Sequence, residues 1–339
     1  MRLSKREELS VRPIGKTELT VTSLGFGGAP IGGVGTRISD EQAADIVQVA
    51  WDGGMRYFDT APLYGHGLSE RRLGRALSAM PRDEFVLSSK VGRLLVPAAD
   101  GERDPIRDNE PLAVNYDYSY DAARASLEAS LTRLGLDRLD IVYCHDIDIW
   151  THGDEQPGVY AQALKGVLPA LNDLRAQGVI KAFGLGVNEW RVCDQVMDHF
   201  DVDVCLLAGR FTLLEQEPLD TFLPRCLREG TSIVIGGPFN SGLLANSERK
   251  RATYDYKPVD DARWAKAQAI RRLCESHGVD IRAAAMQYPL RHPAVSAVIP
   301  GCWKTSEVTT NLELFSASIA DALWTDLAHE GLSRRIESH

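Results

Sequence analysis

Short apolar segments recur along the chain and predict eight β-strands. Several of these segments are continuously apolar and do not alternate between apolar and polar residues. Such runs are typical of a parallel sheet whose faces are covered by helices. The predicted strands cover residues 23–27, 56–59, 85–90, 141–145, 182–188, 204–208, 232–235 and 295–299.

Amphipathic helices are predicted between these strands, because apolar residues recur there every three or four positions. Ser39 and Gln42 have the spacing of a capping box, and Gly53 and Gly54 follow as a stop signal. The succession of βα units favours an α/β fold, a (β/α)8 barrel of the TIM type. Periodicity alone also allows an open, doubly wound sheet.

The chain is predicted to form a single barrel domain over residues 1–339. A β-hairpin is expected at residues 11–21, the barrel at 22–315, and a C-terminal helix and tail at 319–339. Two long stretches that look irregular, 92–117 and 146–157, follow the third and fourth strands. Loops of this length are uncommon unless they are functional. Because barrel active sites lie at the C-terminal ends of the strands, we expect both loops to form walls of a substrate pocket.

Charge and composition argue against several classes of partner. A net charge of −9 argues against nucleic acid, because phosphate binding depends on clustered Lys and Arg. No apolar stretch reaches the roughly 18 residues of a membrane span. Residues 1–12 are charged and lack the apolar core of a secretory signal. The 6 cysteines are scattered without a disulfide framework, so we expect buried thiols in a cytoplasmic protein.

Five polar side chains are expected to meet at one end of the barrel. Asp59, Lys90, His145 and Asn188 each end a different predicted strand, and Tyr64 follows Asp59 on the next loop. Each residue alone has a structural explanation, since Asp and Asn often form turns and a Lys at a strand end is usually solvated. In a barrel, however, all of these strand ends converge on the same mouth.

This set of residues suits proton transfer coupled to hydride transfer. A tyrosine has an ordinary pKa near 10, and a neighbouring Lys90 cation is expected to lower the pKa of Tyr64. Asp59 would pair with Lys90 and keep it charged. His145 would donate a hydrogen bond to the oxygen of a carbonyl or alcohol and orient it.

Other catalytic motifs are absent from the sequence. It contains no GxGxxG fingerprint, no GxxxxGK[ST] loop and no GxSxG elbow. His145, Asp146 and Asp148 are close in sequence, but neighbouring positions of one strand point to opposite faces. We therefore expect no metal site.

The candidate residues lie in segments that resemble the aldo-keto reductase family. The segments occur in the family's order and span nearly the whole chain, at residues 58–65, 88–91, 133–137, 139–145, 184–188, 299–301 and 308–311. The resemblance implies an oxidoreductase that uses NAD or NADP. It also implies a catalytic tetrad of Asp59, Tyr64, Lys90 and His145, with Tyr64 as the general acid/base.

The resemblance further implies a set of cofactor contacts. Asn188 is expected to hold the nicotinamide carboxamide, and the loop 236–244 to cover the pyrophosphate. Backbone amides at 301–305, which open a late helix, are expected at the adenosine ribose. The complete expected set is Gly28, Asn188, Gly236, Pro238, Phe239, Asn240, Gly242, Leu243, Pro300, Gly301, Thr305, Glu307 and Asn311.

Three positions depart from the family's pattern. Ala208 stands where the family usually has Gln, and Gly236 stands where an aromatic residue usually stacks on the nicotinamide. Glu307 stands where NADP-preferring members often have Arg, so we expect a preference for NAD over NADP. Lys304 is a nearby cation that keeps NADP use open.

Within the family, the chain is similar to a bacterial subgroup of aldose, L-fucose and pyridoxal dehydrogenases. This similarity implies oxidation of the anomeric carbon of an aldose to a lactone. The aromatic residues Tyr116, Tyr118 and Trp150 of the two long loops are expected either to stack on the substrate or to anchor these loops, and Tyr116 and Trp150 are the predicted substrate contacts. Pyridoxal is an alternative substrate, because its internal hemiacetal presents the same reacting group. A second alternative is a regulatory subunit that senses nicotinamide redox state. The sequence identifies neither the individual sugar nor the oligomeric state.

Overall fold

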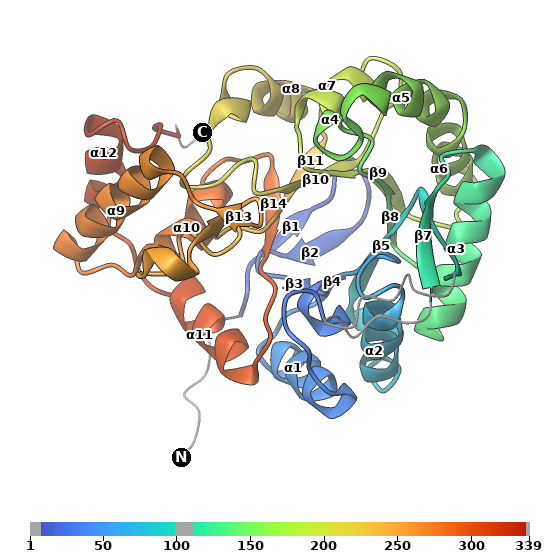
Figure 1. The fold of residues 1–339 in the computed structure, drawn as a ribbon, viewed down its shortest axis with the longest axis horizontal. Helices are drawn as coiled ribbons and strands as arrows, with labels where there is room; N and C mark the ends of the chain where they lie inside the picture. The colour runs from blue at the N-terminus through green and yellow to red at the C-terminus, as the bar shows by residue number, and fades with distance from the viewer. Residues whose placement is uncertain (1–7, 99–111, 337–339) are drawn as a thin grey trace.

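The computed structural model describes residues 8–98 and 112–336, and its centre is a barrel of eight parallel strands (Figure 1). Bridges from Leu24 to Val298 and from Gly27 to Gly301 join the first strand of the sheet to the last. This closure confirms the predicted barrel and excludes the open doubly wound sheet. The strands, in their order around the barrel, are β14 (Val295–Ile299), β11 (Ser232–Gly236), β10 (Val204–Ala208), β9 (Ala182–Val187), β8 (Ile141–His145), β5 (Val86–Val91), β4 (Tyr57–Asp59) and β3 (Phe26–Gly27).

Helices surround the barrel on its outside (Figure 1). The predicted capping box is present at the start of α1: the Ser39 side chain accepts the Gln42 N–H at 3.2 Å, and the Gln42 side chain accepts the Ser39 N–H at 2.8 Å. The helices are α1 (Asp40–Asp52), α2 (Leu68–Leu77), α3 (Tyr120–Leu134), α4 (Ile149–His152), α5 (Gln156–Lys165), α6 (Val167–Ala176), α7 (Arg191–Val196), α8 (Phe222–Glu229), α9 (Asp261–Ser276), α10 (Ile281–Leu290), α11 (Thr305–Phe315) and α12 (Asp321–His329).

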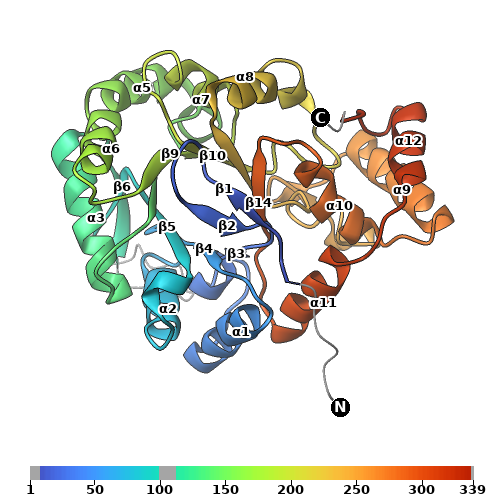
Figure 2. The same ribbon diagram turned by 180° about the vertical axis from the view of Figure 1, so that it is seen from behind.

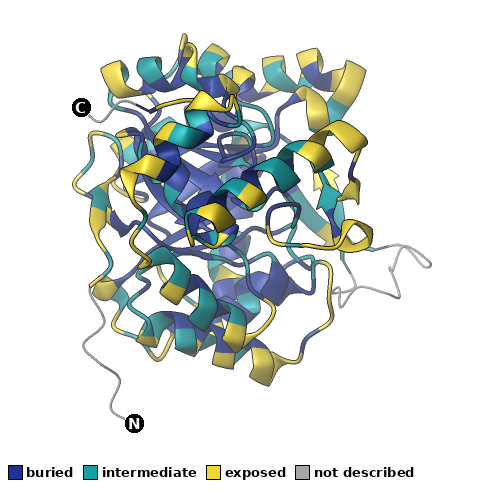
Figure 3. Ribbon diagram, turned by 90° about the vertical axis from the view of Figure 1, so that its left-hand side faces the viewer, coloured by how far each residue is buried: buried dark blue, intermediate teal, exposed yellow. Residues whose placement is uncertain are grey.

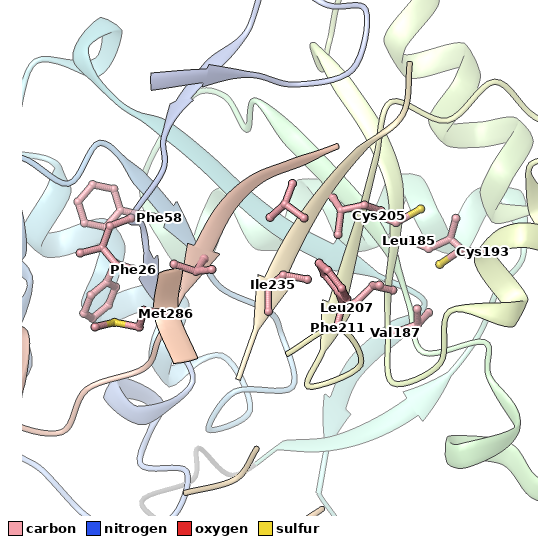
Figure 4. Packing of buried hydrophobic residues seen from close by; sticks show 14 of the residues in the cluster. Phe26, Phe58, Leu185, Val187, Cys193, Cys205, Leu207, Phe211, Ile235 and Met286 are labelled. Atoms are coloured by element: carbon pink, nitrogen blue, oxygen red, sulfur yellow. The ribbon is translucent and has the colours of Figure 1, made fainter. Parts of the chain in front are cut away.

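Successive residues of each strand belong to two different hydrophobic cores, because side chains alternate between the two faces of a strand. On β4, Tyr57 packs inside the barrel, whereas Phe58 packs between the barrel and its helices. On β8, Ile141 and Tyr143 likewise point inward, and Val142 points outward. Figure 4 shows part of the outer core, and Figure 3 shows that the surrounding helices bury one face and expose the other.

A hairpin of β1 (Val11–Pro13) and β2 (Thr20–Thr22) closes the N-terminal end of the barrel (Figure 2). Its residues Ile14, Leu19 and Val21 belong to the inner core. The Gly15 N–H also donates to the Ser232 hydroxyl at 2.8 Å, which fixes the hairpin against β11. The opposite end, where the strands finish, therefore remains for the active site.

Both stretches that were predicted to be irregular contain regular structure, so that part of the prediction is wrong. In the first, β6 (Arg93–Pro97) pairs with β7 (Leu112–Tyr116) in an antiparallel hairpin, while residues 99–111 lie outside the described residues. The second contains α4 and the start of α5, with the Asp148 side chain capping α4 by accepting the Thr151 N–H at 2.9 Å. The pairing of β6 with β7 spans a long connection, and α4 is only one turn long, so neither produces a clear local period.

A third hairpin was not predicted. It pairs β12 (Thr253–Tyr254) with β13 (Lys257–Pro258). The division of the chain into one domain, with the boundaries given above, stays a prediction. Within residues 8–98 and 112–336, no helix is long and apolar enough to cross a membrane.

Candidate active site

Three of the predicted catalytic residues occupy inward-facing positions at the ends of adjacent strands. Asp59 ends β4, Lys90 precedes the last residue of β5, and His145 ends β8. Each lies two or four residues beyond an inner-core side chain of its own strand, and so points to the same side. All three are buried.

Lys90 and Asp59 form a buried ion pair at the centre of the site. The Lys90 Nζ lies 2.7 Å from Asp59 Oδ2 and donates to the Thr60 carbonyl at 2.9 Å. The second carboxylate oxygen of Asp59 accepts from the Ser88 hydroxyl at 2.7 Å. Burial opposes the charged form of Lys90, but the Asp59 carboxylate and the Tyr64 oxygen together outweigh this effect, and the pKa of Lys90 is raised. Lys90 is therefore held in its charged form beside Asp59.

Space for the Lys90 side chain is provided by a glycine on β9. A Cβ at Gly186 would lie 3.2 Å from Lys90 Cε and 3.4 Å from Lys90 Cδ. The side chain of Lys90 thus crosses the end of the barrel over a position where any other residue would crowd it.

Tyr64 lies beside this charge on the turn that follows β4. Its ring centroid is 4.8 Å from Lys90 Nζ and 6.3 Å from the ring centroid of His145, with the two rings perpendicular. Burial raises the pKa of Tyr64 to about 12, although the Lys90 cation acts in the opposite direction. The effect of Lys90 has the predicted sign, but the predicted net lowering of the Tyr64 pKa is wrong, because desolvation is the larger effect.

His145 is neutral at physiological pH. Burial, together with the Arg93 and Lys90 cations, holds the pKa of His145 well below its usual value. Its Nε2 lies 3.3 Å from Asp146 Oδ2, and its buried Nδ1 has no hydrogen-bond partner among the described residues. A neutral imidazole with its proton on Nε2 can donate that proton to an oxygen in the mouth.

Asp146 belongs to the site, although it was considered above only as a metal ligand. It follows His145 in an unusual left-handed conformation, with φ of 45°, and forms a buried ion pair with Arg93. Burial raises the pKa of Asp146 to about 7, with the Asp148 carboxylate adding to the rise and Arg93 opposing it. The position of Asp146 next to His145 in the sequence could have indicated that it belongs to the site. Its backbone conformation, in contrast, is visible only in the structure.

Asn188 is held from three sides. Its Nδ2 donates to Asp146 Oδ1 at 2.9 Å, and its backbone N–H donates to Asp148 Oδ2 at 2.6 Å. Its carbonyl accepts from Arg210 Nε at 2.5 Å. Because a carboxylate can only accept, the amide nitrogen of Asn188 faces Asp146, and the amide oxygen faces away from Asp146.

Arg210 connects Asn188 to the third hairpin, a connection that the sequence did not indicate. Its guanidinium donates to both carboxylate oxygens of Asp255, at 3.0 and 2.8 Å. Asp255 and Tyr256 form the turn of this hairpin, and both have positive φ. The Tyr256 side chain is exposed. Arg210 therefore links this turn to Asn188 at the mouth.

The loop after β11 contains several of the predicted cofactor residues, namely Gly236, Pro238, Phe239, Asn240, Gly242 and Leu243. Both ends of the buried Asn240 amide are engaged: it donates to the Gly209 carbonyl at 3.1 Å and accepts from the Thr212 hydroxyl at 2.8 Å. Leu243 is fully buried in the outer core, and Phe239 packs against that core. These side chains shape the loop, so it would meet a ligand chiefly through its backbone.

Two of the three positions that depart from the family's pattern lie together. Ala208 at the end of β10 is paired in register with Gly236 at the end of β11. Two small residues in neighbouring strands leave this part of the mouth without a large side chain from either position.

Another group of predicted cofactor residues lies where β3 meets β14. The Gly28 N–H donates to the Asp59 carbonyl at 2.8 Å, and a Cβ at Gly28 would lie 2.6 Å from that oxygen. The Gly27 N–H donates to the Pro300 carbonyl at 3.2 Å, and Gly27 forms a bridge with Gly301.

The remaining predicted cofactor residues lie on α11. The helix begins at Thr305 without a side-chain cap from the preceding residue. Instead, the Glu307 carboxylate accepts the Trp303 N–H at 2.8 Å. The buried Asn311 donates to Cys302 Sγ at 3.3 Å, so its amide oxygen remains available as an acceptor. Exposed backbone donors at the helix start and an amide acceptor further along fit the adenosine end of a dinucleotide.

Tyr116 and Trp150 lie on the segments that flank the mouth, whereas Tyr118 is buried and its hydroxyl donates to the His145 and Asp146 carbonyls, which makes it an anchor of the loop. Tyr116 on β7 is half exposed, and its ring centroid lies 4.9 Å from that of His152 and 5.0 Å from the Arg93 guanidinium carbon. Trp150 is also half exposed and lies on α4, whose N-cap Asp148 binds Asn188. Within the described residues, no group of three or more His, Cys, Asp or Glu side chains could hold a metal ion.

The chain is similar to known proteins over nearly its whole length. The model of the Aldo/keto reductase family matches residues 23–328. The pyridoxal 4-dehydrogenase of Microbacterium luteolum is 39% identical over 333 residues, covering 95% of this chain and 97% of that protein. The D-threo-aldose 1-dehydrogenase of a Pseudomonas species is 40% identical over 323 residues, covering 93% and 95%. The structure of an aldo-keto reductase from Bacillus halodurans in its holo form aligns with a TM-score of 0.73 at 22% identity, covering 98% of this chain and 99% of that one.

Proposed function

The chain belongs to the aldo-keto reductase family of oxidoreductases, and we propose that it oxidises the anomeric carbon of an aldose hemiacetal to a lactone. The observation that carries this proposal is the buried Lys90–Asp59 pair next to the Tyr64 ring. A fixed cation beside a phenol, at the mouth of the barrel, suits the removal of a proton from a hydroxyl group. The 40% identity to a protein named D-threo-aldose 1-dehydrogenase supports a sugar as the source of that hydroxyl.

In this mechanism, Tyr64 as phenolate takes the proton from the C1 hydroxyl of the hemiacetal. Lys90 stabilises the phenolate, and Asp59 keeps Lys90 charged and in place. His145, being neutral, donates its Nε2 proton in a hydrogen bond to the substrate oxygen and orients C1. When bound, the nicotinamide cofactor supplies the hydride acceptor.

Several residues of this chain fit a nicotinamide dinucleotide. The amide oxygen of Asn188, which faces away from Asp146, is an acceptor suited to the carboxamide N–H groups. The start of α11 offers backbone donors to the ribose and phosphates. The Glu307 carboxylate at this helix start disfavours a further phosphate, so NAD is the preferred cofactor and NADP the weaker one.

Pyridoxal is the second candidate substrate. It is supported by the 39% identity to a protein named pyridoxal 4-dehydrogenase, which spans 97% of that protein. Its internal hemiacetal presents the same reacting hydroxyl to Tyr64, and the half-exposed Tyr116 offers a ring face for its pyridine ring.

Replacing the proposed general base tests the mechanism. Tyr64→Phe removes the only proton-accepting atom of this side chain, so we expect kcat for aldose or pyridoxal oxidation to fall by at least about 100-fold. The binding of NAD, measured by titration calorimetry, is expected to change little. Tyr120→Phe is the matched control, since the Tyr120 hydroxyl bonds Asp173 on the outside of the barrel. Turnover of Tyr64→Phe above a few per cent of wild type would refute the role of Tyr64.

The pH dependence tests the same proton transfer. Oxidation requires the phenolate of Tyr64, whose pKa is raised to about 12, so its population grows with pH below that value. We expect kcat for oxidation to rise between about pH 6 and 10, by up to about tenfold per pH unit. The reverse reduction requires the phenol and is the internal control, because its rate should not rise with pH. An oxidation rate that falls over this range would contradict the assignment.

Charge reversal on α11 tests the cofactor preference. Glu307→Arg replaces a carboxylate with a cation able to bind a phosphate, so we expect the ratio of the NADP and NAD dissociation constants to move about tenfold towards NADP. Binding is measured by calorimetry with the oxidised cofactors. Glu313→Arg, an exposed position on the same helix, controls for net charge. An unchanged ratio in Glu307→Arg would mean that Glu307 does not face the adenosine phosphate.

A further inference from the structure

A second buried ion pair lies at the mouth and has no part in the proton transfer described above. Asp146 and Arg93 form this pair, and the exposed fractions of the two residues are only 6% and 7%. Burying two charges has a large desolvation cost that a well-packed apolar pair would avoid. Asp146 also has a φ of 45°, a conformation that non-glycine residues rarely adopt. Strain of this kind is concentrated at functional sites.

The position of the Asp146 carboxylate relates it directly to the substrate. Its Oδ2 lies 3.3 Å from His145 Nε2, the atom assigned to hold the reacting oxygen. A substrate oxygen bonded to that nitrogen lies about 3 Å from it. A hydroxyl on the carbon next to the reacting one is thus brought within reach of the carboxylate.

Arg93 and Tyr116 complete the surroundings of this carboxylate. The buried Nε of Arg93 has no hydrogen-bond partner among the described residues, so one donor of this guanidinium is unused. The same guanidinium lies 5.0 Å from the centroid of the half-exposed Tyr116 ring. A carboxylate acceptor, an unused donor and a ring face together match a polyhydroxylated ring, whose hydroxyls donate and accept and whose C–H face is apolar.

We propose that Asp146 is a specificity-determining residue that accepts a hydrogen bond from the C2 hydroxyl of an aldose, with Arg93 holding its carboxylate in place. This inference rests on the proposed oxidation of a hemiacetal. It identifies the C2 hydroxyl as the group of the substrate that the site recognises. Sugars without a C2 hydroxyl lose this hydrogen bond to a charged group and are oxidised less efficiently, although Arg93 and Asn188 still pair the carboxylate.

The test pairs one variant with one change in the substrate. The substrates are an aldose oxidised by the wild type and its 2-deoxy analogue, and kcat/KM is measured for both at saturating NAD and about pH 9, where Asp146 is a carboxylate. Wild type is expected to favour the aldose by about 50-fold, the size expected for the loss of one hydrogen bond to a charged group. In Asp146→Asn, whose side chain also suits positive φ, the ratio is expected to fall below about 5-fold. Asp321→Asn, at a carboxylate that is 90% exposed in its ion pair with Arg291, is the matched control and keeps the wild-type ratio.

Other outcomes of this test overturn the proposal. Equal losses for both sugars in Asp146→Asn would mean that Asp146 only positions His145 and Asn188. An unchanged ratio would mean that it does not meet the C2 hydroxyl. Should Asp146→Asn fail to fold, Arg93→Lys keeps the charge pair but not the planar guanidinium. A ratio that stays at the wild-type value in that variant also overturns the proposal.

Failure of the proposed function gives a different result. If the wild type oxidises no sugar, calorimetry of the protein with NAD still compares the aldose with its 2-deoxy analogue. Tighter binding of the aldose that is lost in Asp146→Asn supports recognition by Asp146 even then. Equal binding of both sugars to wild type overturns it.

Discussion

The ion pair between Lys90 and Asp59 is the interaction on which the site depends. A lysine buried to this extent stays charged only beside a fixed carboxylate, and the 2.7 Å contact with Asp59 provides one. The pair in turn depends on the barrel, because β4 and β5 are neighbours and both residues occupy inward positions at the strand ends. Gly186 on β9 leaves room for the lysine. Removing either charge would leave the other buried and unpaired, at a cost of about 3–5 kcal/mol.

A second layer of interactions surrounds this pair and connects separate parts of the chain. Asp146 links His145 to Asn188, and Arg210 links Asn188 to the turn of the third hairpin through Asp255. His145, Asn188 and the rim of the mouth are thereby connected by hydrogen bonds and by the close contact of His145 with Asp146. A change at the hairpin turn can reach Asn188 through a single arginine.

The inner part of this arrangement could be predicted from the sequence, whereas the outer part could not. Asp59, Lys90 and His145 end strongly apolar segments, and the period of a strand fixes the side on which they appear. The hairpin of β6 and β7 depends on pairing between residues far apart in the chain, which leaves no local period. The pKa of Tyr64 depends both on the neighbouring Lys90 charge and on how deeply the side chain is buried. The charge could be predicted from the sequence, whereas the extent of burial could not. Arg210 and Asp255 come together only through the tertiary fold.

The most direct test of the central claim follows the hydrogen on C1. Purified protein is given NAD and an aldose deuterated at C1, and the products are analysed by mass spectrometry and NMR. The account predicts a lactone, deuterium in the reduced nicotinamide, and a slower rate than with the unlabelled sugar if hydride transfer limits turnover. Reduced nicotinamide without deuterium would contradict it, as would the absence of any reduction with a panel of aldoses and pyridoxal.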